Sequence, residues 1–281
     1  MVKGTLYIVG TPIGNLEDIT LRALNTLKKV DLILAEDTRN TLKLLNHFEI
    51  EKKMISYHRH NEQDKISQVL SYLDTGKDLA LVSDAGMPII SDPGQNLIYY
   101  LVHNHYPVEV IPGVTAFVTA IVKSGMDSTR FTFEGFLSVH KPKRMKRLKE
   151  LKEETRTMIF YEAPHKLLET LKNMYQVWGN RNICIARELT KLHEEFSYTT
   201  LEQAIEKISL EGIRGEIVLI VQGRDEKELE QEKVQAFQEK DVKELVKSYM
   251  QEGMDKKEAI KLVAKQRGVT KNEVYQECIS L

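Results

Sequence analysis

The feature that most constrains the fold is a fivefold alternation of short apolar runs with helical segments over the first 125 residues. The apolar runs span residues 6–9, 31–35, 54–57, 79–82 and 108–111, and a turn and a segment of helical periodicity follow each of them. Strands separated by helices of this length are expected to lie parallel in one sheet, with helices on both faces. The run LALV at 79–82 has no polar residue, as expected for a strand buried on both faces.

The pattern changes after Gly125. Strand-like runs at 131–136, 158–161, 183–186, 195–199 and 216–221 have fewer helices between them, which predicts a second α+β domain with a mixed or antiparallel sheet. The remainder is a charge-rich helical region that ends in a helix-turn-helix-like unit, which binds DNA in some proteins and packs against protein in others. The sequence thus predicts an α/β protein with an N-terminal α/β domain (1–125), a second α+β domain (126–223) and a C-terminal helical region (224–281).

Composition narrows the class of protein. The 281 residues carry 40 lysines and arginines against 41 aspartates and glutamates, so the formal net charge of -1 gives no overall attraction to a polyanion. The two cysteines, Cys184 and Cys278, form no CxxC or Cys/His cluster, which excludes a thiolate zinc site and fits a reducing compartment. No apolar stretch approaches the ~20 residues of a membrane span, so a soluble cytoplasmic protein without a membrane partner is expected.

The densest group of turn-forming and polar residues, SDAGMPIISDPG at 83–94, follows the fourth predicted strand. Two Asp, two Gly and two Pro exceed the needs of a plain turn, so a long shaped loop is expected where α/β sheets bind ligands. Gly86 would permit close backbone approach, and the Asp84 carboxylate would accept hydrogen bonds from a ribose or an ammonium group. The loops at 10–14 and 111–117 lack the GxGxxG and GK[ST] patterns, so the expected ligand has no polyphosphate.

Two further strand ends carry charged and polar groups. AEDTR places Glu36, Asp37 and Arg39 together, and helix capping explains only one of them. An arginine in the first helical turn opposes the helix macrodipole, so Arg39 is expected to make a salt bridge or to bind an anionic ligand. SYHRHNEQ at 56–63 follows no HExxH pattern, so this segment is expected to hydrogen-bond a polar substrate, and no metal site is predicted.

The local concentration of basic side chains lies in VHKPKRMKRLKELKEETR at 139–156. Its cations precede its acidic residues, and in a helix this order opposes the macrodipole. A sequence selected for helix stability alone would have the reverse order. A polyanion site and a solvated helix face are both open for the five leading cations, Lys141, Lys143, Arg144, Lys146 and Arg147.

Eight motifs give the chain a specific resemblance to a known family over residues 6–221. They are VGTPIGNLEDIT, AEDTR, HNE, LVSDAGMPIISDPG, FEGFL, IFYEAPHKLLETL, ARELTKLHEE and GEIVLIV. In order and spacing they resemble the bacterial ribosomal RNA small subunit methyltransferase I family, part of the tetrapyrrole methylase superfamily. Met87 departs from the usual Thr of the family, and Val114 and Thr115 depart from a common Pro and Ser. These changes lie in the loops that are expected to bind the cofactor, and they remove no ionisable group.

The resemblance implies a two-domain tetrapyrrole-methylase-like fold that binds S-adenosyl-L-methionine between the domains. It implies 2'-O-methylation of a cytidine ribose in the decoding region of small-subunit ribosomal RNA. The partner is then this RNA or the assembled small ribosomal subunit, and a homodimer is left open. Carried over by position, the cofactor contacts are Pro12, Ser83, Asp84, Ala85, Gly86, Thr115, Ala116, Phe160, Leu189 and Glu216. For Phe160 and Leu189, packing in the core of a sheet is an equal alternative.

Methyl transfer to a hydroxyl requires that the oxygen is held at attack distance and that its proton is removed. The candidates for the base are Glu36, Asp37 and Glu62, because each lies at a predicted strand end. The sequence does not rank them, and transfer of the proton to water is an alternative. The expected RNA contacts are Arg39, His60, Asn61 and Lys191, with residues 141–147 on the flanking backbone.

Two other functions stay open. One is C-methylation of a tetrapyrrole ring by an enzyme of the same superfamily, for which the basic segment and the helical tail would be unnecessary. The other is non-catalytic ribosome binding by a methylase fold that no longer turns over. Binding of S-adenosylhomocysteine would distinguish a working cofactor site from a vestigial one.

Overall fold

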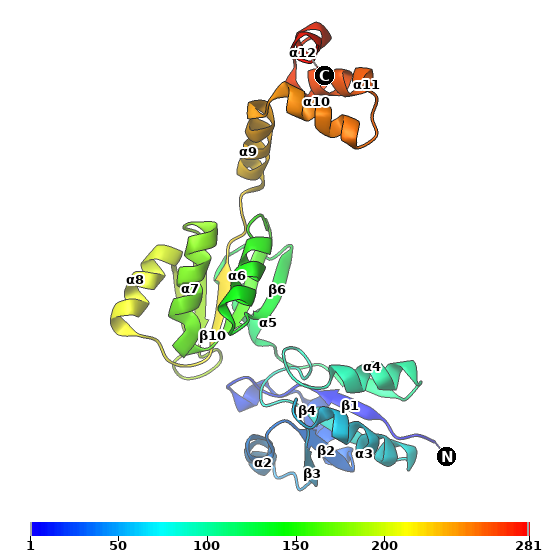
Figure 1. The fold of residues 1–281 in the computed structure, drawn as a ribbon. Helices are drawn as coiled ribbons and strands as arrows, with labels where there is room; N and C mark the ends of the chain where they lie inside the picture. Colours follow the sequence, from blue (N-terminus) through cyan, green and yellow to red (C-terminus); the bar gives the residue numbers. More distant parts are fainter. Residues whose placement is uncertain (1, 280) are drawn as a thin grey trace. The chain divides into compact units, whose positions relative to one another are not determined.

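The chain forms two compact units, Met1–Gly223 and Arg224–Leu281. The computed structural model describes residues 2–279 and residue 281, without the side chains of residues 233, 236, 237 and 239. The first unit contains both sheets (Figure 1). The boundary predicted between residues 125 and 126 falls inside this unit and stays a prediction.

Five parallel strands form the first sheet, in the order β3-β2-β4-β1-β5. They are β1 (Leu6–Val9), β2 (Leu32–Ala35), β3 (Met54–Ser56), β4 (Leu79–Val82) and β5 (Val108–Ile111). The predicted parallel sheet is confirmed. Every residue of β2 and β4 is buried, as expected for inner strands with helices on both faces. Because all five strands run in one direction, the loops that follow them lie at one edge of the sheet.

Helices cover both faces of this sheet. A short 3-10 helix, η1 (Leu16–Asp18), precedes α1 (Leu21–Lys29). α1 and α2 (Thr38–His47) pack on one face through Leu27 and Leu45. α3 (Glu62–Asp74) and α4 (Gln95–His103) pack on the other face through Leu73 and Leu97. The helices thus fix the sheet as the middle layer of three.

The second sheet is mixed, as predicted. Its order is β6-β7-β10-β8-β9, in which β6 and β7 pair in parallel and the other neighbours pair antiparallel. The strands are β6 (Phe131–Phe136), β7 (Thr157–Glu162), β8 (Asn182–Arg187), β9 (Glu195–Thr200) and β10 (Ile217–Val221). A bulge interrupts the β6–β7 register between Phe133 and Gly135.

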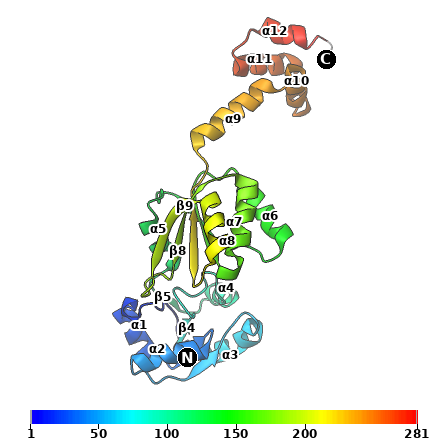
Figure 2. The ribbon, with the colours of Figure 1, turned by 90° about the vertical axis from the view of Figure 1, so that its left-hand side faces the viewer.

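The two faces of the second sheet have different covers (Figure 2). α6 (Lys141–Glu150), α7 (Pro164–Trp178) and α8 (Leu201–Glu211) lie on one face. α5 (Ala116–Ser124), which follows the last strand of the first sheet, packs on the other face through Ala120 and Ile121. Ile13, from the loop after β1, belongs to the same apolar cluster. This shared cluster connects the strand-end loops of the first sheet to the second sheet.

The second unit is helical, with α9 (Glu226–Glu239), α10 (Val242–Gln251), α11 (Lys256–Arg267) and α12 (Lys271–Glu277). Its own small core comes from α10, α11 and α12 and includes Val246, Val263 and Val274. Gly268 ends α11 in the left-handed conformation, and Thr270 caps α12 in a capping box. The sequence predicts a helix-turn-helix-like unit for this segment.

Candidate active site

A cavity of about 450 Å³ lies where the strand-end loops of the first sheet meet the second sheet. One wall comes from loops after β1, β2, β4 and β5: Ile13, Glu36, residues 84–87 and 90–92, Thr115 and Ala116. The other wall comes from ends of strands in the second sheet and adjoining turns: Phe136, residues 161–164, Leu189 and residues 215–218. The cavity is therefore lined by residues that are up to 205 positions apart in sequence, from Ile13 to Val218.

The loop after β4 is fixed to the loop after β1 by backbone hydrogen bonds. Thr11 N donates to Gly86 O at 2.9 Å, and Gly86 N donates to Thr11 O at 3.1 Å. Gly86 has a φ of +79°, which favours glycine. Ser83 is buried beneath the loop, where its hydroxyl donates to Ala85 O at 3.4 Å. Of the predicted cofactor loop, Asp84, Ala85 and Gly86 line the cavity, whereas Ser83 shapes the turn.

The loops after β1 and β5 touch at two glycines. A Cβ on Gly10 would lie 2.8 Å from both the Cα and the N of Gly113, closer than real Cβ contacts. It would also lie 2.7 Å from the Met87 sulfur. The floor of the cavity therefore depends on the absence of a side chain at Gly10.

Five acidic residues line the cavity: Glu36, Asp84 and Asp92 in the wall from the first sheet, and Glu162 and Glu216 in the wall from the second. Burial raises the pKa of Glu36, and the negative charge of Asp84 adds to the rise. Burial and the charge of Glu36 raise the pKa of Asp92 to about 6, although a hydrogen bond from Ser83 opposes the change. Asp84 accepts from Asp37 N and from Asn40 Nδ2, both at 3.2 Å. The sequence analysis did not single out Asp92, although it is the second Asp of SDAGMPIISDPG, the motif that contains Asp84.

The other two predicted base candidates do not line the cavity. The Asp37 carboxylate caps α2 through Arg39 N at 2.8 Å and pairs with the Arg39 guanidinium at 2.6 Å. Hydrogen bonds from Arg39 lower the pKa of Asp37 to about 2, which makes it a poor proton acceptor. Glu62 lies in the first turn of α3; burial raises the pKa of the nearby Tyr57 phenol, and the Glu62 carboxylate adds to the rise. The carboxylates of Asp37 and Glu62 thus lie outside the cavity, and Glu36 alone of the three candidates lines it.

The polar segment after β3 is organised by its own turn. Asn61 Oδ1 accepts from His58 N at 2.9 Å, and Asn61 Nδ2 donates to Ser56 O at 3.2 Å. His60 is exposed, with its ring 6.0 Å from that of His58. Arg59 donates to the carbonyl of Ser91 and so ties this segment to the loop that carries Asp92. Asn61 thus has a structural role, while His60 remains available for the predicted RNA contact.

The strand alternation in β7 separates two neighbouring aromatic residues. Phe160 is only 1% exposed and packs in the core beneath α6, α7 and α8, with its ring 6.2 Å from that of Trp178. Tyr161 points to the opposite face and lines the cavity, and burial raises its pKa to about 12. Tyr161 therefore presents its side chain to the cavity, whereas the cofactor contact predicted for Phe160 stays a prediction that its burial does not favour.

Of the remaining residues predicted to bind cofactor or RNA, some line the cavity and others lie outside it. Leu189 and Glu216 line the cavity, and Pro12 is buried outside the set of lining residues. Lys191 forms ion pairs with Glu216 at 3.0 Å and with Glu188 at 3.1 Å. Lys191 therefore stands beside the cavity as the partner of a lining carboxylate.

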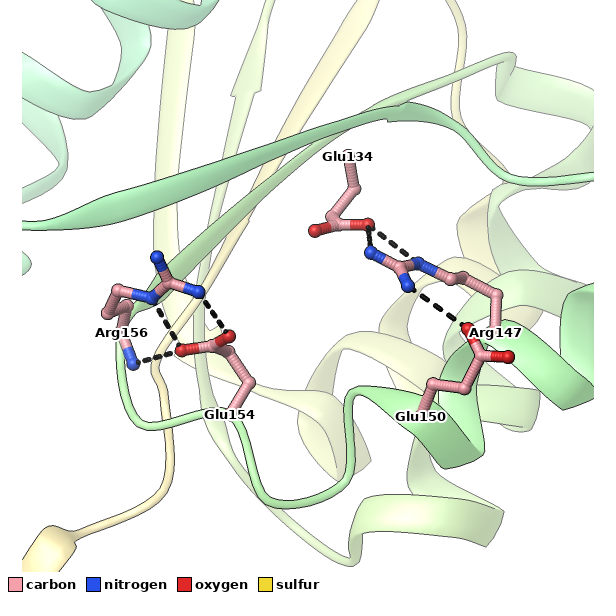
Figure 3. Close-up of polar contacts among 5 residues, drawn as sticks. All are labelled: Glu134, Arg147, Glu150, Glu154 and Arg156. Atoms are coloured by element: carbon pink, nitrogen blue, oxygen red, sulfur yellow. Dashed lines mark hydrogen bonds and ion pairs between the residues drawn. The ribbon is translucent and has the colours of Figure 1, made fainter.

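Part of the basic segment, Lys141–Glu150, forms α6, and the two arginines of this helix pair with carboxylates of the protein. The Arg144 side chain is 6% exposed, pairs with Glu169, and donates to Ser138 O at 3.1 Å and Val139 O at 3.2 Å. Arg147 donates to Glu134 at 2.7 Å and to Glu150 at 3.0 Å (Figure 3). The charge of Arg144 is already buried and paired, which does not favour the RNA contact predicted for it, and that contact stays a prediction.

Three lysines of the segment, Lys141, Lys143 and Lys146, remain exposed. No ion pair of these lysines occurs within the described part of the chain. A second arginine–carboxylate pair follows α6, where Glu154 accepts from Arg156 at 2.8 Å (Figure 3). The arginines thus hold the helix in place, and the lysines form its free cationic face.

No described helix is both long and apolar enough to cross a membrane. Within residues 2–279 and residue 281, no group of three His, Cys, Asp or Glu side chains is arranged to hold a metal ion.

Comparison with solved structures supports the fold. A cobalt precorrin-4 methyltransferase is 17% identical with a TM-score of 0.61, over 78% of this chain and 94% of that chain. A uroporphyrin-III C-methyltransferase from Thermus thermophilus, solved with S-adenosylhomocysteine, is 18% identical with a TM-score of 0.58, over 78% of this chain and 97% of that chain. At these identities the likeness is one of fold.

Comparison of sequences gives the family. The chain matches the family described as Tetrapyrrole (Corrin/Porphyrin) Methylases over residues 5–205. It is 48% identical to "Ribosomal RNA small subunit methyltransferase I" of Halalkalibacterium halodurans over 97% of this chain and 94% of that protein. The protein of the same name from Thermotoga maritima is 47% identical over 222 residues, which are 79% of this chain and 100% of that protein. The predicted resemblance is confirmed: this chain belongs to the tetrapyrrole methylase family and, within it, to the ribosomal RNA small subunit methyltransferase I proteins.

Proposed function

We propose that the chain is an S-adenosylmethionine-dependent methyltransferase of small-subunit ribosomal RNA, and that it methylates the ribose 2'-hydroxyl of a cytidine in the decoding region. The observation that carries the proposal is the 48% identity over nearly the full length to a protein named "Ribosomal RNA small subunit methyltransferase I". The 2'-hydroxyl, the cytidine and the decoding region are the finer part of the proposal and follow from the family resemblance. The cavity supports it, because it lies at the strand ends where α/β sheets bind ligands. Such a substrate would place the reaction in the cytoplasm.

The cavity suits S-adenosylmethionine, which carries an ammonium, a sulfonium, a ribose and an adenine but no phosphate. Its volume of about 450 Å³ lies in the range of roughly 300–1,000 Å³ typical of small-molecule sites. Glu36 and Asp84 supply acceptors and negative charge for the cationic groups, and Ile13 and Leu189 supply apolar surface. A Cβ on Gly86 would come within 3.3 Å of Ile13 Cγ2, so glycine keeps this surface open.

When bound, the cofactor supplies a methyl group for in-line displacement. The protein has three tasks: to orient the substrate hydroxyl behind that methyl group, to exclude water and to receive a proton. The two cavity walls would orient the hydroxyl and exclude water, because a reactant between them is contacted from both sides.

For the RNA backbone we propose the lysine face of α6, made of Lys141, Lys143 and Lys146. These side chains are exposed, whereas Arg144 and Arg147 of the same helix are held by acidic partners. Arg39, 87% exposed at its side chain, and His60 are proposed as further RNA contacts near the strand-end loops. Because the chain as a whole is nearly neutral, RNA affinity must come from local cationic groups such as these, so we expect poor binding of short isolated RNA and better binding of the assembled subunit.

Replacement of Lys141, Lys143 and Lys146 by glutamine tests this face. If each lysine contacts a phosphate, the slope of log affinity against log salt should become shallower by about two units, because each lost contact removes ~0.7–0.9. Filter binding to small subunits at several salt concentrations measures the slope. A matched triple variant at the exposed Lys28, Lys43 and Lys53 makes the same change in net charge and should retain the wild-type slope. An unchanged slope in the α6 variant would remove this helix from the RNA interface.

The second unit is proposed to be unnecessary for cofactor binding. The relative from Thermotoga maritima is matched along its whole length by 222 residues, close to the extent of Met1–Gly223. A chain that ends after Gly223 should bind S-adenosylhomocysteine within about threefold of the full-length affinity, measured by titration calorimetry. The full chain should be stabilised by ~2.7 kcal/mol at 100 times the dissociation constant. A truncated protein that remains folded but loses the ligand would show that the second unit contributes to the cofactor site.

A homodimer is proposed through the outer surface of α5 and β9. Val122 is 77% exposed, and Tyr198 beside it is 59% exposed, with its hydroxyl donating to Lys123 O at 2.7 Å. Leu192 is 93% exposed in the turn whose Glu194 pairs with Lys123 at 2.8 Å. Exposed apolar side chains that gather in one place favour a protein interface. Light scattering of the wild type and of Val122→Asp gives the assembly state directly.

The main alternative is C-methylation of a tetrapyrrole, the activity in the names of the solved structures. Those proteins are 17–18% identical to this chain, against 48% for the relative named for ribosomal RNA. Incubation with labelled S-adenosylmethionine and either undermethylated small subunits or uroporphyrinogen III tests the choice. We expect label in the RNA, and label in the tetrapyrrole would overturn the proposal. Cofactor binding without transfer to either substrate would favour a non-catalytic ribosome-binding protein.

A further inference from the structure

We propose that Asp92 accepts the proton of the attacking hydroxyl during methyl transfer, and that Glu36 is a positioning residue whose charge tunes it. The inference rests on the proposed function. The oxygen forms a bond to the methyl carbon, the carbon–sulfur bond breaks with its electron pair going to sulfur, and the hydroxyl proton moves to the Asp92 carboxylate. The proton then passes to solvent, so the carboxylate is restored for the next turnover.

The first support is the position of Asp92 at the junction of the two cavity walls. Asp92 and its neighbour Ser91 both line the cavity. The Ser91 hydroxyl lies 3.2 Å from the place that a Cβ on Gly135 would occupy, so this loop reaches the β6 bulge of the second sheet. A hydroxyl substrate held between the two walls would therefore meet the loop that carries Asp92.

The second support is strain in the same loop. Ile89 has a φ of +77° and Ser91 a φ of +72°, both in the left-handed region that such residues rarely adopt. Arg59 donates to the Ser91 carbonyl from the segment after β3 and holds the turn from outside. Backbone strain that the surrounding structure maintains is typical of functional loops. Here its effect is to direct residues 90–92 into the cavity.

The third support is electrostatic. The charged and titratable groups that act on Asp92 are Glu36 after β2, Arg59 after β3, Asp84 after β4 and Tyr161 in β7. The two carboxylates favour protonation of Asp92, and Arg59 opposes them. The resulting pKa of about 6 suits a base that must hold a proton briefly and release it near neutral pH. Asp37, by contrast, is held ionised by Arg39.

Asp92→Asn and Glu36→Gln separate the two roles. The rate of a single turnover is measured on undermethylated small subunits with saturating S-adenosylmethionine, between about pH 5.5 and 8.5. The wild-type rate should rise with pH through an apparent pKa near 6, because only the ionised carboxylate accepts a proton. Asp92→Asn should lower the rate at neutral pH by about 100-fold or more and abolish that rise. Glu36→Gln should retain the rise but move it to lower pH, because a neighbouring negative charge is removed.

Calorimetry with S-adenosylhomocysteine provides a readout that does not depend on turnover. Asp92→Asn should bind this ligand within about threefold of wild type, since its defect is in proton transfer. Glu62→Gln is the matched control: it also neutralises a carboxylate from the predicted candidates, but one outside the cavity, and should keep the wild-type rate and pH profile. If Asp92→Asn fails to fold, Asp92→Glu decides, because it keeps a carboxylate and should keep a slower rate with the same kind of pH rise.

The outcomes are distinct. An Asp92→Asn rate within about tenfold of wild type, or a persistent rise near pH 6, would overturn the inference. The inference would also be overturned if the rate of Asp92→Glu did not rise with pH. It would equally be overturned if Glu36→Gln abolished the rise in rate with pH and did not merely shift it. Failure of the wild-type protein to bind S-adenosylhomocysteine or to methylate small subunits would instead overturn the proposed function.

Discussion

Arg144→Ala is expected to lower the free energy of unfolding by about 2–4 kcal/mol. The wild-type guanidinium is almost fully buried, pairs with Glu169, and donates to the carbonyls of Ser138 and Val139. Its removal leaves two carbonyls without this donor and opens space under α6. Because Glu169 is 59% exposed at its side chain, water can solvate it after the substitution, and this limits the loss.

Urea denaturation of Arg144→Ala and Lys143→Ala measures this effect. Lys143 precedes Arg144 in the same helix and is exposed, so its variant should stay within about 0.5 kcal/mol of wild type. Equal stability of the two variants would contradict the structural role of Arg144 and reopen its assignment to RNA.

Gly10→Ala is expected to lower both the affinity for S-adenosylhomocysteine and the free energy of unfolding, with the larger effect on affinity. The new Cβ would lie 2.8 Å from backbone atoms of Gly113, so the loops after β1 and β5 must separate. Overpacking of this kind costs about 1–3 kcal/mol. Since these loops carry Ile13 and Thr115 into the cavity, we expect affinity for S-adenosylhomocysteine to fall by about tenfold or more.

Gly179→Ala is the matched control for Gly10→Ala. Gly179 has a φ of +73°, a ψ of −163° and open space around it, so alanine there adds backbone strain of about 1–3 kcal/mol without a clash. Its affinity for S-adenosylhomocysteine, measured by calorimetry, should be that of wild type. If both variants bind equally well, the close contact of Gly10 and Gly113 does not shape the site.

The strands could be predicted from the sequence because their signal is local. β1, β4 and β5 begin and end where their apolar runs do, and the mixed second sheet follows from strands with few helices between them. The strand-end loops could also be predicted, since Asp84 and Gly86 belong to a segment too rich in turn residues for a plain turn. These are the parts of the fold and the site that depend on short stretches of chain.

The remaining features depend on contacts between distant segments. Whether Phe160 or Tyr161 faces the cavity is set by the register of β7 against β10, which pairs Leu219 with Phe160. The direction of Asp92 depends on a strained turn that Arg59 holds from another loop. The burial of Arg144 depends on Glu169, 25 residues away in α7. No local pattern in the sequence encodes these contacts.

The central claim is methylation of a ribose hydroxyl in small-subunit RNA, and mapping the methyl group tests it most directly. Small subunits from a strain that lacks the enzyme are incubated with the purified protein and labelled S-adenosylmethionine, and the RNA is digested to nucleosides for mass spectrometry. The account predicts 2'-O-methylcytidine, with the label confined to a fragment of the decoding region and absent without the protein. Label on a base, label in another region of the RNA, or unlabelled RNA from an enzyme that binds S-adenosylhomocysteine would contradict it.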